Sequence, residues 1–170
     1  MRRRKKRIMK VGGVLVKSRG QLDGIRESGK INTPLLDYVQ QNICAGISTE
    51  EIDQWVYRLT TEMGAVPAPL NFEGFPKSVC TSLNSVVCHG IPDERVILKE
   101  GDIINVDVST IYKGYFSDAS RTFCIGEVSA DKRRLVQAAK EAVQVGLLEV
   151  KPWRPIGDMG HAVHLYAESQ

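Results

Sequence analysis

The chain has 170 residues, of which 42% are hydrophobic and 25% charged, which is enough for one domain with a substantial core but short for two. No apolar run approaches the length of a transmembrane span. The net charge is +3, yet seven lysines and arginines and no acidic residue fall in the first ten residues, which leaves −4 (3 − 7) on the remainder. A mildly acidic body argues against a protein whose folded surface binds nucleic acid through a basic face.

Four cysteines are scattered along the sequence without a Cys-x-x-Cys pair: Cys44, Cys80, Cys88 and Cys124. This spacing argues against a zinc ribbon and against a redox motif. It indicates reduced thiols, and it therefore predicts a cytoplasmic protein.

Residues 1–21 are predicted to be a basic tail and an irregular lead-in, and residues 22–170 are predicted to form one domain. The charged tail resembles the start of a signal peptide. However, its apolar run is short, Lys10 interrupts it, and no small-residue cleavage site follows. Two interpretations of the tail stay open: a disordered, solvated segment, or a weak and salt-sensitive contact with RNA.

The first predicted helix begins at Thr33, because threonine is a good N-cap and Pro34 then falls in the first turn. Gly46 is predicted to end it. Residues 22–30 before it are only partly helical in pattern, since two glycines weaken them.

A second helix is predicted with more support, because Ser48 and Glu51 have the spacing of a capping box. Gly64 is predicted to close this helix. Its apolar stripe is expected to be core rather than a cofactor site. The stripe consists of Ile52, Trp55, Val56, Leu59 and Met63.

Residues 65–74 are predicted to be a loop. Two short strands are expected to follow it, at 78–83 and 86–89, joined by a turn between them. His89 lies at the end of the second predicted strand, where a turn signal follows. A single histidine in such a place is more often structural than catalytic, so His89 alone does not define a site.

Residues 103–124 are predicted to form a β-hairpin, because both arms alternate with period two and a turn signal lies at 113–114. Each arm carries one aspartate, Asp107 on the first and Asp118 on the second. With a longer loop the two aspartates would be direct cross-strand partners. With the tight turn, Asp118 would face Ser109 and Asp107 would lie diagonally on the same face of the sheet.

A pair of carboxylates on one face of a hairpin needs a physical explanation. Two ionised carboxylates about 5 Å apart repel each other by roughly 3 kcal/mol at an effective dielectric constant near 20. A hairpin tolerates this arrangement if the pair shares a proton or if a divalent cation lies between them. The alternative is a different register, in which one aspartate is an ordinary solvated strand residue.

After the hairpin, Ser129 is predicted to cap a helix that two prolines end, and Ile156 or Gly157 is predicted to open a last helix. His161 and His164 lie three residues apart on that helix, but no third ligand is near, so a solvated face is favoured over a metal site. The order of helices, strands and helices predicts an α+β fold with an antiparallel sheet covered by helices. The sequence contains no P-loop, no dinucleotide fingerprint and no nucleophile elbow.

Three stretches resemble type I methionine aminopeptidases. Residues 74–92 contain Gly-Phe-Pro-Lys-Ser-Val-Cys-Thr-Ser-Leu-Asn and Val-Val-Cys-His-Gly-Ile-Pro. Residues 101–108 read Gly-Asp-Ile-Ile-Asn-Val-Asp-Val, and residues 114–123 read Gly-Tyr-Phe-Ser-Asp-Ala-Ser-Arg-Thr-Phe. Several motifs in the right order make this a specific signal, and the resemblance covers roughly residues 22–170.

The resemblance implies a pita-bread (creatinase/aminopeptidase-like) fold that holds two divalent metal ions, with Co, Mn, Fe and Zn all compatible. It implies removal of the initiator methionine from nascent proteins when the second residue is small. Asp107 would bind one metal and Asp118 would bridge both, while His89 would act as the catalytic group near the scissile amide. The side chains that would line the substrate pocket are Phe72, Phe75, Cys80 and, on its polar side, His89.

The sequence departs from the family pattern at its end. The remaining family ligands are a histidine in a His-Gly-Ile-Gly motif and two glutamates, which would lie downstream of the last predicted helix, and no His-Gly-Ile-Gly occurs here. The chain is therefore expected to be C-terminally truncated, with an incomplete second half of the fold. We expect Asp107 and Asp118 alone to bind metal weakly, and an unpaired sheet edge to favour self-association. Whether such a chain is active alone stays open.

Two alternatives remain beside the aminopeptidase. One is a non-catalytic pita-bread relative that binds RNA or the ribosome through the basic tail. The other is a related peptidase that acts on X-Pro bonds, which the Pro-Lys-Ser-Val-Cys and Cys-His-Gly-Ile-Pro runs disfavour. The expected partners are the N-terminal methionine peptides of nascent chains, with a ribosome contact and no membrane.

Overall fold

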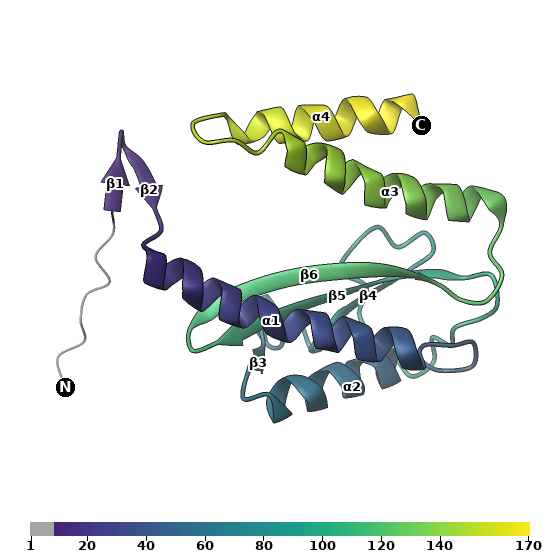
Figure 1. Ribbon diagram of the computed structural model, residues 1–170. Coiled ribbons are helices and arrows are strands. Elements are labelled where there is room, and N and C mark those ends of the chain that lie inside the picture. Colours follow the sequence, from purple (N-terminus) through teal and green to yellow (C-terminus); the bar gives the residue numbers. More distant parts are fainter. Residues whose placement is uncertain (1–8) are drawn as a thin grey trace. The chain divides into compact units, whose positions relative to one another are not determined.

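The computed structural model describes residues 9–170 (Figure 1). The described chain divides after Ile125 into two compact units, residues 9–125 and Gly126–Gln170. The described part of the first unit contains β1 (Met9–Val11), β2 (Val14–Val16), α1 (Arg19–Asn42), α2 (Thr49–Glu62), β3 (Val66–Pro67), the short 3₁₀ helix η1 (Phe72–Gly74), β4 (Cys80–Leu83), β5 (Ile103–Tyr112) and β6 (Tyr115–Cys124). The second unit contains α3 (Ala130–Leu148) and α4 (Ile156–Ser169).

β5 is the central strand of the main sheet, and all of its pairings are antiparallel. β6 pairs with β5 along the whole of residues 103–112. The other edge of β5 pairs with β4 near its start and with β3 near its end. The predicted hairpin over residues 103–124 and the predicted α+β class are both confirmed.

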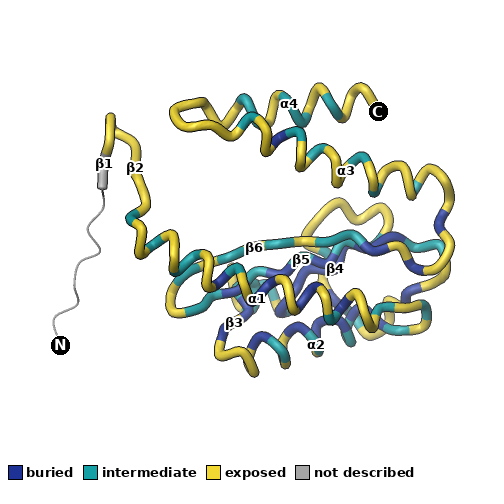
Figure 2. The backbone as a smooth tube through the Cα atoms, in the orientation of Figure 1, coloured by how far each residue is buried: buried dark blue, intermediate teal, exposed yellow. Residues whose placement is uncertain are grey.

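The core of the first unit lies between one face of this sheet and the helices α1 and α2, and Figure 2 shows buried residues in dark blue on these helices and on the sheet strands. Ile104, Val106 and Val108 on β5 are fully buried, while the residues between them are only partly buried. Leu35 of α1 and Ile52 of α2 have no exposed surface. Strand alternation therefore gives β5 one packed face and one polar face.

Helix α1 is much longer than predicted, and the prediction of a helix start at Thr33 is wrong. Ser18 is the N-cap, and the capping box closes with Gln21. The helix then continues through Pro34 without a break. Pro34 removes the hydrogen bond to the carbonyl of Lys30, and both residues are exposed, so water can solvate that carbonyl while the buried stripe holds the helix together.

The predicted irregular lead-in is also wrong where the structure describes it. β1 and β2 form a small hairpin with the pairs Met9↔Val16 and Val11↔Val14. Gly12 and Gly13 form its turn with φ values of 56° and 82°, a conformation that glycine adopts easily. The greater part of the predicted basic tail, residues 1–8, lies outside the described residues.

The second of the two predicted short strands, 86–89, is absent from the described chain, whereas the first appears as β4. The chain turns out of the sheet at Asn84, whose φ is 48°. The amide of Val86 then donates to the carbonyl of Leu83 at 3.0 Å, which closes a turn instead of extending a ladder. Val87 is 93% exposed, so this stretch is a surface loop. The predicted loop 65–74 in turn contains β3 and η1.

The remaining helices follow the sequence signals. Ser48 caps α2 with the predicted capping box, and Ser129 caps α3. The stripe of α2 is core, except that its last member, Met63, is exposed. α4 begins at Ile156, as predicted, and in the second unit the hydroxyl of Tyr166 donates to Glu141 of α3.

All four cysteines are free thiols. Among the helices within residues 9–170, none is both long and apolar enough to cross a bilayer.

The packing of α1 against the sheet can be tested with a matched pair of leucines. Leu35 is fully buried and Leu22 on the same helix is 40% exposed. We expect Leu35→Ala to lower the free energy of unfolding by about 2–5 kcal/mol, because it leaves a cavity in the core. Leu22→Ala should cost less than about 1 kcal/mol. Urea titration followed by far-UV circular dichroism measures both, and equal losses would contradict this account of the core.

Candidate active site

The two aspartates of the hairpin lie on the polar face of the sheet, away from the core. Lys113 and Gly114 have φ values of 49° and 79°, which are those of a two-residue hairpin turn. The tight-turn alternative is therefore the one observed, and Asp118 is paired with Ser109. Asp107 lies diagonally from Asp118 on the same face, as that alternative requires.

A cavity of about 540 Å³ opens on this face. It is lined by residues from β4, from β5 and from loops that are distant in the sequence. Five of the six predicted site residues line it, namely Phe72, Phe75, Cys80, His89 and Asp107. The sixth, Asp118, is exposed and does not line the cavity. It accepts a hydrogen bond from the hydroxyl of Ser109, and Ser109 does line the cavity.

One wall of the cavity is a tight loop anchored on α2. The amide of Asn71 donates to the carbonyl of Phe75 at 2.8 Å, which closes the loop. Directly after it, Lys77 forms an ion pair with Glu50 of α2. The amide of Ser78 donates to Asp53 of the same helix at 2.6 Å. These contacts fix the two phenylalanines of the loop at the cavity.

His89 reaches the cavity from the loop after β4, where the backbone passes unusually close to the strand. The amide of Thr81 donates to the carbonyl of Gly90 at 2.8 Å, and the amide of Gly90 donates to the hydroxyl of Ser82 at 3.2 Å. A Cβ at Gly90 would lie 2.1 Å from the carbonyl oxygen of Thr81, so only glycine fits. His89 itself has φ of 54°, a strained value that these contacts hold in place.

Asp107 lies in an electrostatic environment unlike that of a surface carboxylate. Burial, and then the negative charge of nearby Asp118, raise its pKa from the ordinary 3.8 to about 6, although His89 opposes the shift. Its Oδ1 atom is buried and has no hydrogen-bond partner among the described residues. An unpaired carboxylate oxygen beside a second carboxylate is an arrangement that a cation would stabilise.

Cys80 forms a buried part of the cavity wall and is the direct cross-strand partner of Asp107. Burial, together with the negative charges of Asp107 and Asp118, raises the pKa of its thiol to about 11. The thiol is therefore neutral at physiological pH, and it offers a soft, polarisable surface rather than a nucleophile.

The described residues provide only part of a metal site. Asp107 and Asp118 fit a divalent cation, because hard carboxylate oxygens are suitable ligands and one of them lacks any other partner. Within residues 9–170, no three side chains of His, Cys, Asp or Glu gather closely enough to hold a metal ion.

Sequence reasoning assigned five of the twelve residues that line the cavity, and Ser109, Glu73 and Ile91 are among those that it missed. Ser109 links Asp118 to the cavity, and its place opposite Asp118 follows from the tight-turn register. Glu73 and Ile91 also line the cavity. No local pattern singles out these two, because they reach the cavity through the path of surface loops.

The raised pKa of Asp107 predicts a pH dependence of stability in metal-free buffer. Because its folded-state pKa is about 6 and its ordinary value is 3.8, the protonated carboxyl stabilises the fold below about pH 4. That contribution is lost as the pH rises through about 6. Since the carboxyl is partly solvated, we expect the loss to be about 1 kcal/mol. Asp107→Asn should remove this pH dependence. Urea titrations from pH 4 to 7 measure the free energy of unfolding of both proteins, and the same change with pH in both would contradict the role of Asp107.

Comparison with known proteins identifies relatives of the chain. The model of metallopeptidase family M24 matches residues 23–170. Methionine aminopeptidase A of Synechocystis sp. is 43% identical over 153 residues, which are 90% of this chain and 60% of that protein. The methionine aminopeptidase of Rickettsia prowazekii is 40% identical over 144 residues, or 85% of this chain and 55% of that protein. The chain thus spans about 55–60% of the length of these relatives.

Solved structures agree with the sequence relatives. The crystal structure of methionine aminopeptidase from Rickettsia prowazekii has a TM-score of 0.88 at 38% identity, and the match covers 91% of this chain and 62% of that one. The Xaa-Pro dipeptidase of Bacillus anthracis has a TM-score of 0.80 at 20% identity, covering 91% of this chain and 42% of that one, which is a likeness of fold alone. The predicted pita-bread fold is confirmed, and the chain belongs to metallopeptidase family M24.

Proposed function

We propose that this chain takes part in the metal-dependent removal of N-terminal methionine from nascent proteins whose second residue is small. The observation that carries the proposal is the cavity, which combines an apolar wall, a histidine and a partly buried carboxylate, one oxygen of which has no partner among the described residues. The relatives of about 40% identity that are named methionine aminopeptidases support the same activity.

The apolar part of the cavity suits the side chain of methionine. Phe72 and Phe75 provide flat apolar surface, and the neutral thiol of Cys80 provides a polarisable contact for the thioether sulfur. Cys80 is buried while Phe72 is 66% exposed, so the cavity deepens from the loop towards the sheet. A methionine side chain would enter beside the phenylalanines and end near Cys80.

His89 is the proposed catalytic group of this chain. Its imidazole lines the same cavity as Asp107 and is close enough to oppose the rise in the pKa of that carboxyl. From there it would donate a hydrogen bond to the carbonyl oxygen of the scissile amide and stabilise the charge that develops on it. The contacts of Gly90 with β4 hold this histidine in place before a substrate binds.

Asp107 and Asp118 are the proposed protein ligands of two divalent ions, for which Co, Mn, Fe and Zn are all compatible in kind. Asp107 would bind one ion and Asp118 would bridge both. When bound, such ions acidify water and polarise an amide carbonyl. The hydroxyl of Ser109 would orient the Asp118 carboxylate through the hydrogen bond that it donates to Oδ1.

The methionine pocket is tested by peptide binding. In metal-free buffer we expect Met-Ala-Ser to bind more tightly than Ser-Ala-Ser, since only the first peptide fills the apolar wall. Phe75→Ala should weaken the binding of Met-Ala-Ser about tenfold by removing part of that wall. Phe116→Ala is a matched control, because Phe116 is 64% exposed and does not line this cavity. NMR titration gives the affinities, and equal binding of both peptides by the unaltered protein would reject the proposal.

Release of methionine from Met-Ala-Ser, with and without added Co²⁺ or Mn²⁺, separates an aminopeptidase from a non-catalytic relative. Asp118→Ala is the control against a contaminating peptidase, because it removes the proposed bridging ligand. Methionine release that persists in this variant would come from a contaminating peptidase and not from this chain.

Metal binding by the two carboxylates is expected to be weak. Asp107 and Asp118 provide too few ligands for a closed site, so a dissociation constant of about 0.1–1 mM is expected for Mn²⁺. Asp107→Asn should weaken binding further, because it replaces one carboxylate oxygen by an amide nitrogen and removes the negative charge. Isothermal calorimetry measures both proteins, and tight, stoichiometric binding of two ions would contradict the prediction.

The basic N-terminal segment supports a second candidate function. Seven of the first ten residues are lysine or arginine, and such a run attracts RNA in a salt-dependent way. We infer a contact with the ribosome, where nascent chains emerge in the cytoplasm. This contact is compatible with aminopeptidase activity, and without that activity it would be the main function.

Self-association is the last part of the proposal. Within residues 9–170, the outer edge of β6 pairs with no strand. The second unit has exposed apolar side chains on its own surface, among them Leu148 at 73%. Open edges and apolar surfaces both favour association between copies.

A further inference from the structure

Glu73 lies at the exposed rim of the cavity. The residue lines the cavity and is exposed, as is its neighbour Phe72. Cys80, by contrast, is a buried residue of β4. The cavity therefore has a buried side at the sheet and an exposed rim that carries the Glu73 carboxylate.

The backbone of Glu73 is held in an uncommon conformation. Its φ is 49°, and it lies between Asn71 at 65° and Gly74 at 85°. A side chain other than glycine in this region costs roughly 1–2 kcal/mol. The hydrogen bond between Phe72 and Phe75 within the loop, at 2.9 Å, helps to maintain it. The carboxylate is thus carried on a fixed loop, which favours a binding role over an accidental position.

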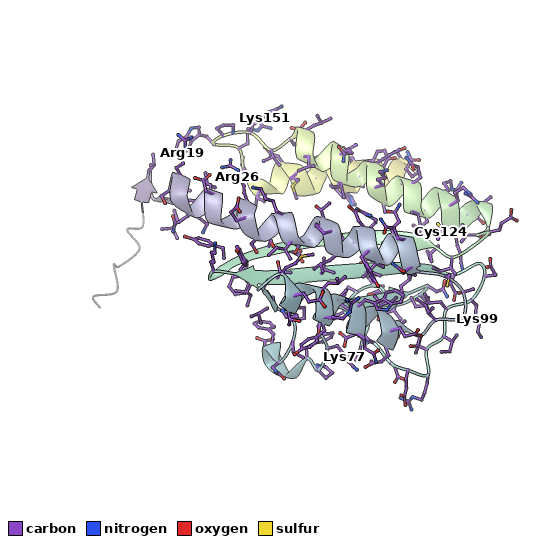
Figure 3. The ribbon with its side chains drawn as sticks, turned by 60° about the horizontal axis from the view of Figure 1, so that its bottom comes forward. Arg19, Arg26, Lys77, Lys99, Cys124 and Lys151 are labelled. Carbon is purple, nitrogen blue, oxygen red and sulfur yellow. The ribbon has the colours of Figure 1, made fainter. Side chains whose placement is uncertain are left out.

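The negative charge of Glu73 is not neutralised by the described protein. No lysine or arginine lines the cavity. Lys77, labelled in Figure 3, is the nearest base along the chain, and it forms an ion pair with Glu50 instead. No hydrogen bond or ion pair of the Glu73 carboxylate occurs within residues 9–170. A cationic group of a ligand would therefore meet an available partner at the rim.

The geometry of an extended peptide shows which of its residues would meet Glu73. Successive side chains of an extended chain point to opposite sides, so the first and third side chains point the same way. If the first side chain enters the cavity towards Cys80, the third also faces this surface of the protein. It lies about 7 Å further along the peptide, which is the rise of two residues. The second residue, which is small in the proposed substrates, points away.

We propose that Glu73 is a specificity-determining residue that favours substrates with a basic side chain at the third position. This inference rests on the proposed function, because it assumes that the first residue occupies the cavity. The favoured ligands are peptides of the form Met-small-Lys or Met-small-Arg. Peptides with an acidic third residue are disfavoured, since their carboxylate would meet that of Glu73.

The test is a set of NMR titrations in metal-free buffer at low salt, with the amidated peptides Met-Ala-Lys, Met-Ala-Gln and Met-Ala-Glu. The unaltered protein should bind the lysine peptide about fivefold more tightly than the glutamate peptide, with the glutamine peptide between them. The preference should shrink at 300 mM salt, because an exposed ion pair is screened.

Variants test whether the side chain of Glu73 causes the preference for a basic third residue. Glu73→Gln should bring the three affinities together, and Glu73→Lys should reverse their order. Glu94→Gln makes the same change of charge at an exposed residue that does not line the cavity, and it should leave the order unchanged. The amide spectrum of each variant reports whether it is folded.

The proposal is overturned if the unaltered protein binds all three peptides equally or not at all, or if the order persists in Glu73→Gln. Failure of the proposed function has a different signature. In that case Ser-Ala-Lys amide would bind as tightly as Met-Ala-Lys amide, whatever the effect of charge at the third position.

Discussion

β5 gives the first unit two faces of opposite character, and the placement of every site residue depends on this division. Ile104, Val106 and Val108 are fully buried on one face, so the strand cannot slip by one residue without exposing all three. The residues between them, including Asp107, must then lie on the other face. The tight turn at 113–114 carries the same division across to β6, where it places Asp118 on the face of Asp107.

The cavity is built on this face by loops that are themselves tied to the core elements. The loop that carries Phe75 is held through Asp53 and Glu50 of α2, and α2 packs into the core. The loop that carries His89 is held by β4, where the backbone approach leaves room only for glycine at position 90. Both walls are thus fixed by contacts that involve no ligand, and the site is largely preformed.

Local signals predicted the elements whose ends and periodicity are fixed by neighbouring residues. Capping serines gave the starts of α2 and α3, and the alternation of residues 103–124 gave the hairpin. Predictions failed where a distant contact outweighs a local preference. Pro34 reads as a helix start, yet burial of the stripe that contains Leu35 carries α1 through it. The segment 86–89 has the composition of a strand, but Asn84 turns it away from the sheet.

The site residues show the same contrast between positions that follow from local sequence and positions that depend on distant contacts. The parity of Asp107 and Asp118 follows from period-two alternation, so their common face was predictable, although only the turn decides between direct and diagonal partners. The residues of the cavity wall come from β4, β5 and separate loops. No local pattern connects Phe72 with Cys80, and only the resemblance to a family predicted that both belong to one pocket. Glu73 had neither kind of signal.

At Asp107, what a metal site requires conflicts with what stabilises the unliganded fold. A carboxyl that is partly buried beside another negative charge favours its protonated form, and its unpartnered oxygen gains nothing from the described chain. An asparagine at this position would remove the repulsion and keep a similar shape, so stability alone does not account for an aspartate. A bound cation would reverse the balance, because it attracts both carboxylates and provides the missing partner. Relief of the repulsion between the two carboxylates would therefore contribute to the free energy of metal binding. Asp107 in this way links the stability of the fold to its function.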